Sequence, residues 1–267
     1  MQEFDPSKLA RSLIRAGADE PTAQQIAQEI ASQIREGMST HEIYSRAFAL
    51  LRTYRGRVAA HYSLKRAMLE FGPTGFPFEK YLAEIFRARG YATTTDQHIP
   101  GRCVEHEVDV VMTKNDPRET VYVEAKFHNA IGFKTDLQVA LYVQARTEDI
   151  IAARGESATS DHKIRGMLAT NTKFTDLAMQ YAICRDLALV SWDYPEKGNL
   201  HDLTSQAGLY PITALSSLNH SAKETLLSNN VVLCRDVLTN KNVLVQAGVP
   251  AGRIPAVVSE AAGLCNA

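Results

Sequence analysis

Apolar residues in the first seventy positions recur every three or four residues, which predicts amphipathic helices. Signals typical of helix N-termini precede three of these segments, and Gly17 and Gly37 are placed to end the first two. A fourth helix is expected over about 58–70, before a break rich in Gly and Pro at 71–75. The N-terminal signals are Asp5-Pro6, Thr22 with Gln25, and Ser39 with Glu42.

The pattern changes after this break. Apolar and polar residues alternate over 103–112 and 120–128, which predicts two strands joined by the turn-forming residues 114–118. Strands and helices then alternate, which predicts a crossover connection in a mixed sheet. The further elements are helices at about 77–89, 135–153 and 174–185, strands at 166–170 and 187–192, and a mainly helical region from about 199.

The predicted hairpin carries the residues best suited to chemistry. With its turn centred on 116–117, antiparallel pairing sets Asp109 opposite Glu124, with β-carbons roughly 4.5–5.5 Å apart on one face. Lys126 lies two residues beyond Glu124 and points the same way. Adjacent carboxylates repel each other, and a divalent cation relieves that repulsion while activating a bound water. This set fits phosphodiester hydrolysis, with a solvated charged face as the simpler alternative.

Strand alternation also assigns the neighbours of Asp109. His106, Val108 and Val110 fall on the opposite, apolar face, so His106 is interpreted as a buried structural histidine rather than a metal ligand. Glu107 falls on the face of Asp109, where it is either a third ligand or an edge residue.

Composition sets limits on the class of protein. The 267 residues allow one large domain or roughly two to three small ones, and 45% hydrophobic with 22% charged residues is ordinary for a globular protein. No apolar run approaches the ~20 residues of a membrane helix, and the N-terminus lacks the features of a secretion signal. We therefore expect a cytoplasmic protein with no membrane partner.

Charge and cysteine content restrict the binding sites. The net charge of −1 means that DNA binding requires a local basic patch, for which a run of cations between 52 and 66 is the candidate and a solvated helix face the alternative. The cysteines are far apart and form no CxxC pair, so we interpret them as small buried residues rather than zinc ligands or disulfides. The cations are Arg52, Arg55, Arg57, Lys65 and Arg66, and the cysteines are Cys103, Cys184, Cys234 and Cys265.

Several motifs follow one another in a fixed order along residues 75–195. They are Phe78-Glu79, Gly90-Tyr91, His106-Glu107-Val108-Asp109 and Glu124-Ala125-Lys126. Gln138 and Tyr142 then lie four residues apart on a predicted helix, before a strand-to-helix segment at 170–182. Together these motifs resemble the Mrr-like restriction endonucleases of the PD-(D/E)XK superfamily, although Val108 stands where some members have proline.

The resemblance implies an α/β fold, a restriction-endonuclease-like mixed-sheet core with the element order αβββαβ. It implies that Asp109 and Glu124 bind Mg²⁺ or Mn²⁺, and that Lys126 orients the attacking water or stabilises the transition state. Glu79 would be an accessory carboxylate on the first helix of the core. The Gln–Tyr pair would support the site or contact the DNA backbone, with ordinary helix packing as the alternative.

A second ordered set lies near the N-terminus, in the segments 3–9, 26–30, the helix around Ile43, and 59–62. Residues 3–71 are similar on this set to the ATP-cone, the helical nucleotide-sensing module of ribonucleotide reductases and their repressors. The resemblance implies ATP or dATP as an effector. That family also has a basic hairpin before its Phe-Asp pair, most of which is missing from this sequence. A plain helical accessory or dimerisation domain is therefore the alternative.

The expected organisation has three parts. An ATP-cone-like helical domain at 1–72 precedes a nuclease domain at 73–195 and a helical C-terminal domain at 196–267. In the last part, the segment 248–254 is faintly similar to a helix-hairpin-helix, whose backbone N–H groups can bind phosphate. Packing between domains is the alternative role for that segment.

From these features we expect a Mg²⁺-dependent endodeoxyribonuclease, similar to type IV restriction enzymes, that acts on foreign or modified DNA. Two alternatives stay open. One is a non-catalytic DNA-binding or nucleotide-sensing protein that keeps the nuclease fold, and the other is an RNA-directed nuclease. Cutting both strands of DNA usually needs two sites, so a homodimer is a further expectation.

Overall fold

The computed structural model describes residues 4–15, 18–35, 37–54, 64–116, 118–130, 132–154 and 162–265. Several sequence features lie outside these residues: the helix end at Gly17, Arg55 and Arg57 of the basic run, the start of the expected fourth helix, and the segment 59–62. Nothing is described of the Arg52 side chain. The ammonium of Lys65 lies 5.8 Å from the centre of the Trp192 ring.

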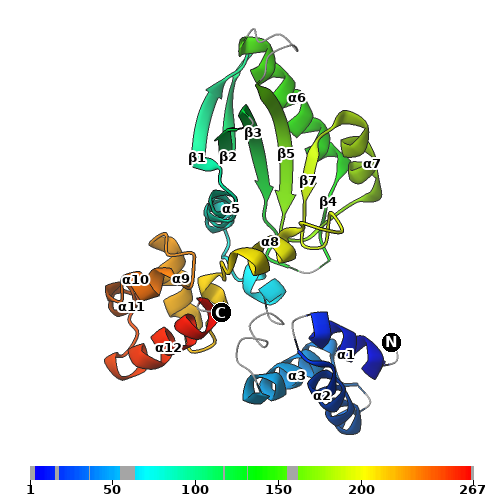
Figure 1. The fold of residues 1–267 in the computed structure, drawn as a ribbon, viewed down its shortest axis with the longest axis vertical. Helices are drawn as coiled ribbons and strands as arrows, with labels where there is room; N and C mark the ends of the chain where they lie inside the picture. Colours follow the sequence, from blue (N-terminus) through cyan, green and yellow to red (C-terminus); the bar gives the residue numbers. More distant parts are fainter. Residues whose placement is uncertain are drawn as a thin grey trace.

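Three N-terminal helices form a core of their own. They are α1 (Pro6–Arg15), α2 (Glu20–Gln33) and α3 (Thr40–Tyr54), and they pack around Leu13, Ile26, Ile30 and Leu51, among other buried residues. Figure 1 shows this group, in blue, apart from the sheet.

The capping predictions for these helices had mixed outcomes. The box formed by Ser39 and Glu42 is confirmed, because Ser39 N donates to Glu42 Oε2 at 3.0 Å and Glu42 N donates to Ser39 Oγ at 3.2 Å. The box expected at Thr22 and Gln25 is wrong. Helix α2 begins one turn earlier, where Asp19 accepts the backbone N–H of Thr22 at 2.9 Å.

The central element is a five-stranded mixed sheet with the order β1-β2-β3-β5-β7. Strands β1 to β3 are antiparallel, and β5 and β7 extend the sheet in parallel with β3. The expected mixed sheet is therefore confirmed. The strands are β1 (Ala92–Pro100), β2 (Glu105–Asn115), β3 (Arg118–Lys126), β5 (Lys163–Thr170) and β7 (Ala188–Val190), with a separate pair β4 (Lys134–Thr135) and β6 (Lys173–Phe174).

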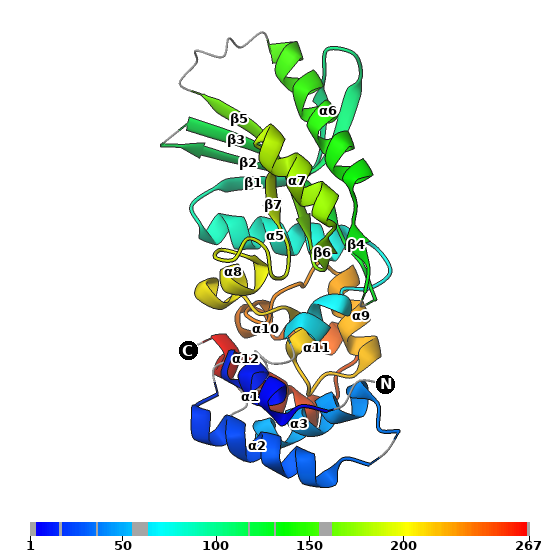
Figure 2. The ribbon, with the colours of Figure 1, turned by 90° about the vertical axis from the view of Figure 1, so that its right-hand side faces the viewer.

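Helices cover both faces of this sheet (Figures 1 and 2). Helix α5 (Phe76–Ala88) packs on one face, against Val110, Val121 and Val123. Helices α6 (Leu137–Arg154) and α7 (Asp176–Arg185) pack on the other, in part against Leu168. All three helices lie close to their expected positions, and β1 is the strand that the sequence pattern did not locate.

The alternation of side chains reverses in β2, which corrects one expectation. Val108 packs with Tyr122 and Ile150 on the α6 face, whereas Val110 belongs to the cluster around α5. The prediction that both share one face is therefore wrong. The reversal coincides with an interruption in the β1–β2 pairing, opposite Asp96, whose φ of +54° lies in the left-handed region.

His106 lies in more polar surroundings than the sequence pattern predicts. Its ring lies on the α6 face, where Nε2 is 2.8 Å from Oδ2 of Asp149. The same carboxylate accepts the backbone N–H of Cys103 at 3.0 Å. His106 is therefore part of a polar contact that fastens the β1–β2 turn to α6, and it is only partly buried.

The C-terminal helices share one hydrophobic cluster with α5 and residues 64–71. The hydroxyl of Tyr81, fully buried on α5, lies 2.7 Å from Thr204 Oγ1 and donates to the carbonyl of Leu209 at 2.9 Å. In the described part of the chain, no helix is long and apolar enough to cross a membrane. The C-terminal elements are α8 (Leu200–Ala207), α9 (His220–Ser228), α10 (Asp236–Thr239), α11 (Asn242–Gln246) and α12 (Ile254–Cys265), with short 3₁₀ turns at Ile212–Ala214 and Ala251–Arg253.

All four cysteines have free thiols, as the absence of CxxC pairs indicates. The expectation that they are buried is correct for Cys234 and wrong for Cys103 and Cys184, which are exposed. Cys103 lies in the β1–β2 turn and Cys184 near the end of α7, and both positions face outward.

Gly166 allows β5 to approach α6 closely, and this generates a prediction. A β-carbon at position 166 would lie 2.6 Å from Thr147 Oγ1 and 3.0 Å from a methyl of Leu187. We expect Gly166→Ala to lower the free energy of unfolding by about 1–3 kcal/mol, measured by chemical denaturation. Adding Thr147→Ala should recover part of the loss.

The control is Gly263→Ala in α12, where nothing lies within 4 Å of the added methyl. Alanine favours helix over glycine, so this variant should be as stable as the parent or slightly more so. Equal stability of the two alanine variants would contradict the close packing of β5 on α6.

Candidate active site

Asp109 stands where strands β2 and β3 part. Their ladder of paired residues extends as far as Val110 with Val123. The next pair in that register is Asp109 with Glu124, so the predicted register is confirmed. In place of a further backbone bond, Oδ2 of Asp109 accepts the backbone N–H of Ala125 at 2.7 Å. The side chain thereby closes the gap between the diverging strands.

Glu124 is a buried carboxylate held by two cations. The residue is 5% exposed. Its Oε1 lies 2.6 Å from Nζ of Lys126, and its Oε2 lies 2.7 Å from a terminal guanidinium nitrogen of Arg146. An ionised carboxylate at this depth requires such partners, because it has lost most of its water.

Lys126 is the more accessible of the two cations. Its side chain is 42% exposed. Burial alone would lower its pKa, but the contact with Glu124 and the charge of Asp109 outweigh this and leave the pKa raised. Lys126 therefore stays a charged donor at the edge of the carboxylate group, where a substrate phosphate or a water molecule can reach it.

Arg146 is the residue of this site that the sequence analysis missed. It is 3% exposed on α6 and donates to Glu124 and, at 2.8 Å, to the carbonyl of Glu107. Its guanidinium carbon lies 5.3 Å from the centre of the Tyr142 ring. A signal existed in the sequence, because Gln138, Tyr142 and Arg146 follow one another at four-residue spacing on one face of the helix.

Glu79, in the first turn of α5, lies near enough to the same carboxylates for their charges to act on its pKa. Burial is the main cause that raises the pKa of Glu79 to about 7, and the charges of Asp109, Asp96, Glu107 and Glu124 add to it. Burial and then the charge of Glu124 likewise raise the pKa of Asp109 to about 6. These carboxyl groups are thus close enough to repel one another.

The structure therefore brings together Glu79, Asp109, Glu124 and Lys126 among the predicted site residues. Tyr142 reaches the group only through Arg146, and 53% of its surface is exposed. Gln138 is exposed one turn earlier on α6. The catalytic roles of all these residues stay predictions.

The oxygen donors at the site fit a hard divalent cation. Among the described residues, no three His, Cys, Asp or Glu side chains converge as a preformed metal site. Mg²⁺ does not require one, because it is commonly held by one or two carboxylates together with waters and substrate phosphates. Asp109 and Glu79 have pKa values raised partly by neighbouring carboxylates, and a cation such as Mg²⁺ or Mn²⁺ would relieve that repulsion.

Comparison with known proteins gives two family matches. Residues 73–193 match a family model of the Mrr catalytic type, described as restriction endonuclease. Residues 210–265 match a model described as AF1548-like, C-terminal. Both matches lie beyond residue 72, so neither describes the ATP-cone-like helices. The first covers the whole carboxylate group and supports a restriction-endonuclease-like domain, a class that typically uses divalent metal ions.

One relative and two solved structures align with this chain to different extents. A protein of Archaeoglobus fulgidus described as uncharacterized is 34% identical over 182 residues, which are 67% of this chain and 97% of the relative. The crystal structure of AF1548, a protein of unknown function, aligns with a TM-score of 0.58 at 32% identity, over 72% of this chain and 99% of that one. Can2 from Sulfobacillus thermosulfidooxidans, solved with cyclic tetra-adenylate, aligns with a TM-score of only 0.35 at 13% identity, over 75% of this chain and 54% of that one.

The buried pair of Glu124 and Arg146 yields a stability prediction. Arg146→Met leaves a buried carboxylate with Lys126 as its remaining cation. We expect a loss of about 3 kcal/mol in the free energy of unfolding, the lower part of the range for a broken buried pair. Denaturation in guanidinium chloride measures it, and Glu124→Gln added to Arg146→Met should restore part of the stability.

Arg185→Met is the matched control, because Arg185 pairs with Glu148 on the surface of the protein. Exposed pairs contribute little, so this variant should unfold almost like the parent. An Arg146→Met protein as stable as Arg185→Met would show that Glu124 does not depend on the guanidinium.

A second prediction concerns pH. A carboxyl whose pKa is raised in the folded protein holds its proton more tightly there than in the unfolded chain. The contribution of Glu79 to the free energy of unfolding therefore falls as pH rises between 4.5 and about 7, which are the ordinary and the raised pKa of this group. Glu79→Gln removes this penalty. The repulsion is screened by partial exposure, so we expect a gain on the order of 1 kcal/mol at pH 8 and almost none at pH 4.

Thermal unfolding of both proteins in EDTA across this pH range measures the effect. Glu196→Gln, at an exposed position outside the site, is the control and should follow the parent at every pH. A difference in thermal stability between Glu79→Gln and the parent that does not change with pH would contradict the raised pKa of Glu79.

Proposed function

We propose that this chain, which belongs to the AF1548-like family and contains a restriction-endonuclease domain, is a metal-dependent endodeoxyribonuclease. One observation carries the proposal. The point where β2 and β3 part carries Asp109, Glu124 and Lys126. Arg146 of α6 pairs with Glu124 there. This is a charged, partly buried group built into the sheet, which argues against a merely solvated strand face.

Asp109 and Glu124 are the residues that we assign to a Mg²⁺ or Mn²⁺ ion, with Glu79 as an accessory carboxylate. When bound, the ion supplies positive charge to the scissile phosphate and lowers the pKa of a coordinated water. Asp109 is held in place for this task by the N–H of Ala125. Arg146 holds Glu124 in position, because its guanidinium pairs with that carboxylate away from solvent.

Lys126 is the residue that we assign to the reacting groups themselves. Its ammonium can donate to the attacking water or to a nonbridging oxygen of the phosphate. The water oxygen bonds to phosphorus, its proton leaves to solvent or a carboxylate, and the bond from phosphorus to the leaving sugar oxygen breaks. That oxygen then takes up a proton. No covalent enzyme intermediate is required.

The regions before and after the nuclease-like core are given supporting roles. We propose that 1–72 is an ATP-cone-like regulatory domain responsive to ATP or dATP, that 73–195 is the catalytic domain, and that 196–267 supports it as a helical domain. A defence role against foreign or modified DNA, and a homodimer that cuts both strands, follow from the resemblance to restriction enzymes of type IV. The non-catalytic alternative predicts DNA binding that ignores metal ions.

Plasmid cleavage with Mg²⁺, Mn²⁺ or EDTA tests this proposal. We expect cleavage that needs metal and that falls on the order of 10²–10³-fold in Asp109→Asn. Asparagine keeps an oxygen that accepts the N–H of Ala125, so folding should be preserved. Glu105→Gln, which changes an exposed carboxylate of the same strand, should cut like the parent.

Each departure from this result has a distinct meaning. Cleavage unchanged by EDTA would refute metal dependence. Full activity of Asp109→Asn would refute the assigned site. Intact DNA binding with no cleavage under any condition, on unmodified and methylated plasmid, would favour the non-catalytic alternative, and cleavage of RNA alone would favour an RNA-directed enzyme.

A further inference from the structure

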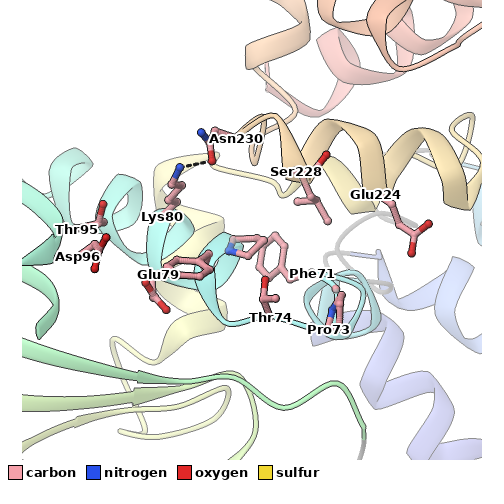
Figure 3. Close-up of a pocket in the computed structure, with 14 residues that line it drawn as sticks. Phe71, Pro73, Thr74, Glu79, Lys80, Thr95, Asp96, Glu224, Ser228 and Asn230 are labelled. Atoms are coloured by element: carbon pink, nitrogen blue, oxygen red, sulfur yellow. Dashed lines mark hydrogen bonds between the residues drawn. The ribbon is translucent and has the colours of Figure 1, made fainter. Parts of the chain in front are cut away.

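A pocket of about 710 Å³ opens beside the carboxylate group, between the core and the C-terminal helices. Figure 3 shows Glu79, Thr95 and Asp96 toward the sheet, with Ser228 and Glu224 on the opposite wall formed by α9. Glu79 belongs both to this pocket and to the candidate active site. A group in the pocket would therefore lie one side chain away from the reacting phosphate.

The floor of the pocket is aromatic and joined to the catalytic strand. Phe71 is almost fully buried, and its ring packs 5.2 Å from Tyr81 and 6.4 Å from Phe127, centre to centre. Phe127 directly follows Lys126. Phe76, in contrast, is 54% exposed at the start of α5 and lines the pocket. An exposed ring of this kind is available to stack on a flat partner.

The walls are braced from both sides, so the pocket is preformed. Lys80 of α5 donates to the side chain of Asn230, as the dashed line in Figure 3 marks. Arg235 pairs with Glu84 of α5 at 2.6 Å. Lys223 of α9 pairs with Glu70 at 2.9 Å on the other side. These contacts join α5 to the segment between α9 and α10, and they join α9 to the segment before α5, as expected for a preformed ligand site.

The polar groups of the pocket select an uncharged ligand with hydrogen-bond donors. Three carboxyl groups line it, and the one amine, Lys80, already donates to Asn230. Carboxylates accept N–H groups and, when ionised, repel a phosphate, whereas hydroxyls can accept or donate a hydrogen bond. The rest of the lining combines apolar Phe, Pro and Leu side chains with the hydroxyls of Thr74, Thr95 and Ser228. A flat apolar face combined with edge N–H donors is the chemistry of a nucleobase.

We propose that this pocket receives the base of a nucleotide next to the phosphate that is cut, turned out of the stack of the DNA strand. The inference rests on the proposed nuclease function, and it adds a base-binding site at the junction of α5, β1 and α9. Enzymes that extrude a base stack it on aromatic or apolar side chains and read its polar edge. Phe76 supplies the stacking surface, while Asp96, Glu224 and Asn230 offer acceptors for the edge.

Free nucleosides test the pocket without any cleavage. Equilibrium dialysis with the four 2′-deoxynucleosides and their 5′-triphosphates should detect saturable binding of at least one nucleoside, and weaker binding of its triphosphate. Ser228→Trp fills the pocket and should weaken binding at least tenfold. Ser221→Trp introduces the same side chain on the same helix outside the pocket, and should bind like the parent. Phe76→Ala removes the stacking ring without filling the pocket, and it should also weaken binding.

Plasmid cleavage by the same proteins supplies the second arm. Ser228→Trp should cut at least tenfold more slowly than the parent, and Ser221→Trp at the parental rate. Absence of nucleoside binding, or binding unaffected by Ser228→Trp, would overturn the pocket even when DNA is cut normally. Nucleoside binding with no cleavage by any of these proteins would overturn the nuclease function instead. Tighter binding of triphosphates would identify a free nucleotide as the ligand of the pocket. Equal cleavage by all variants would refute the role of the pocket in binding a DNA base.

Discussion

The burial of Glu124 between Lys126 and Arg146 is the constraint on which the site depends. A carboxylate that is 5% exposed stays ionised only if cations replace its lost water, and two do so. Arg146 also donates to the carbonyl of Glu107 on β2. A single guanidinium therefore ties α6 to both strands at the point where they part. The same contact that positions the chemistry also attaches the helix to the sheet.

Much of the core could be predicted from the sequence because its strands alternate and its turn is distinctive. The β2–β3 register followed from the turn at 116–117, and the Glu-x-Lys spacing then placed Glu124 and Lys126 together. Strand β1 was not located. Its sequence is mostly polar, it lies at the edge of the sheet, and every second residue is exposed, so it offers little of the hydrophobic pattern by which strands are recognised.

Two other features were beyond the reach of local patterns. The reversal of faces around Asp109 coincides with an interruption between β1 and β2, and strict alternation cannot anticipate a pairing defect beside a strand that it did not locate. Arg146 lies 22 residues after Glu124, so only the tertiary packing of α6 on the sheet brings them together. An arginine in a helical pattern is ordinarily read as a solvated residue.

Helix α5 connects the site to the C-terminal helices through three consecutive residues. Glu79 reaches the carboxylates, Lys80 binds Asn230, and Tyr81 is buried against Thr204. Because a helix moves as a unit, a displacement of the C-terminal helices would also displace Glu79. The C-terminal region is therefore a structural support of the candidate site, although it contributes none of the motifs that define that site.

The charge balance of the candidate site would link the proposed metal binding to the proposed substrate binding. Three carboxyl groups, Glu79, Asp109 and Glu124, face two cations, Lys126 and Arg146, so full ionisation leaves one net negative charge. A phosphate approaching such a group is repelled. At neutral pH, Glu79, with a pKa of about 7, partly avoids this charge by keeping its proton. Adding a divalent cation would make the balance positive and favour ionised Glu79. Metal binding would then displace the proton, complete the ligand set and turn repulsion of the phosphate into attraction.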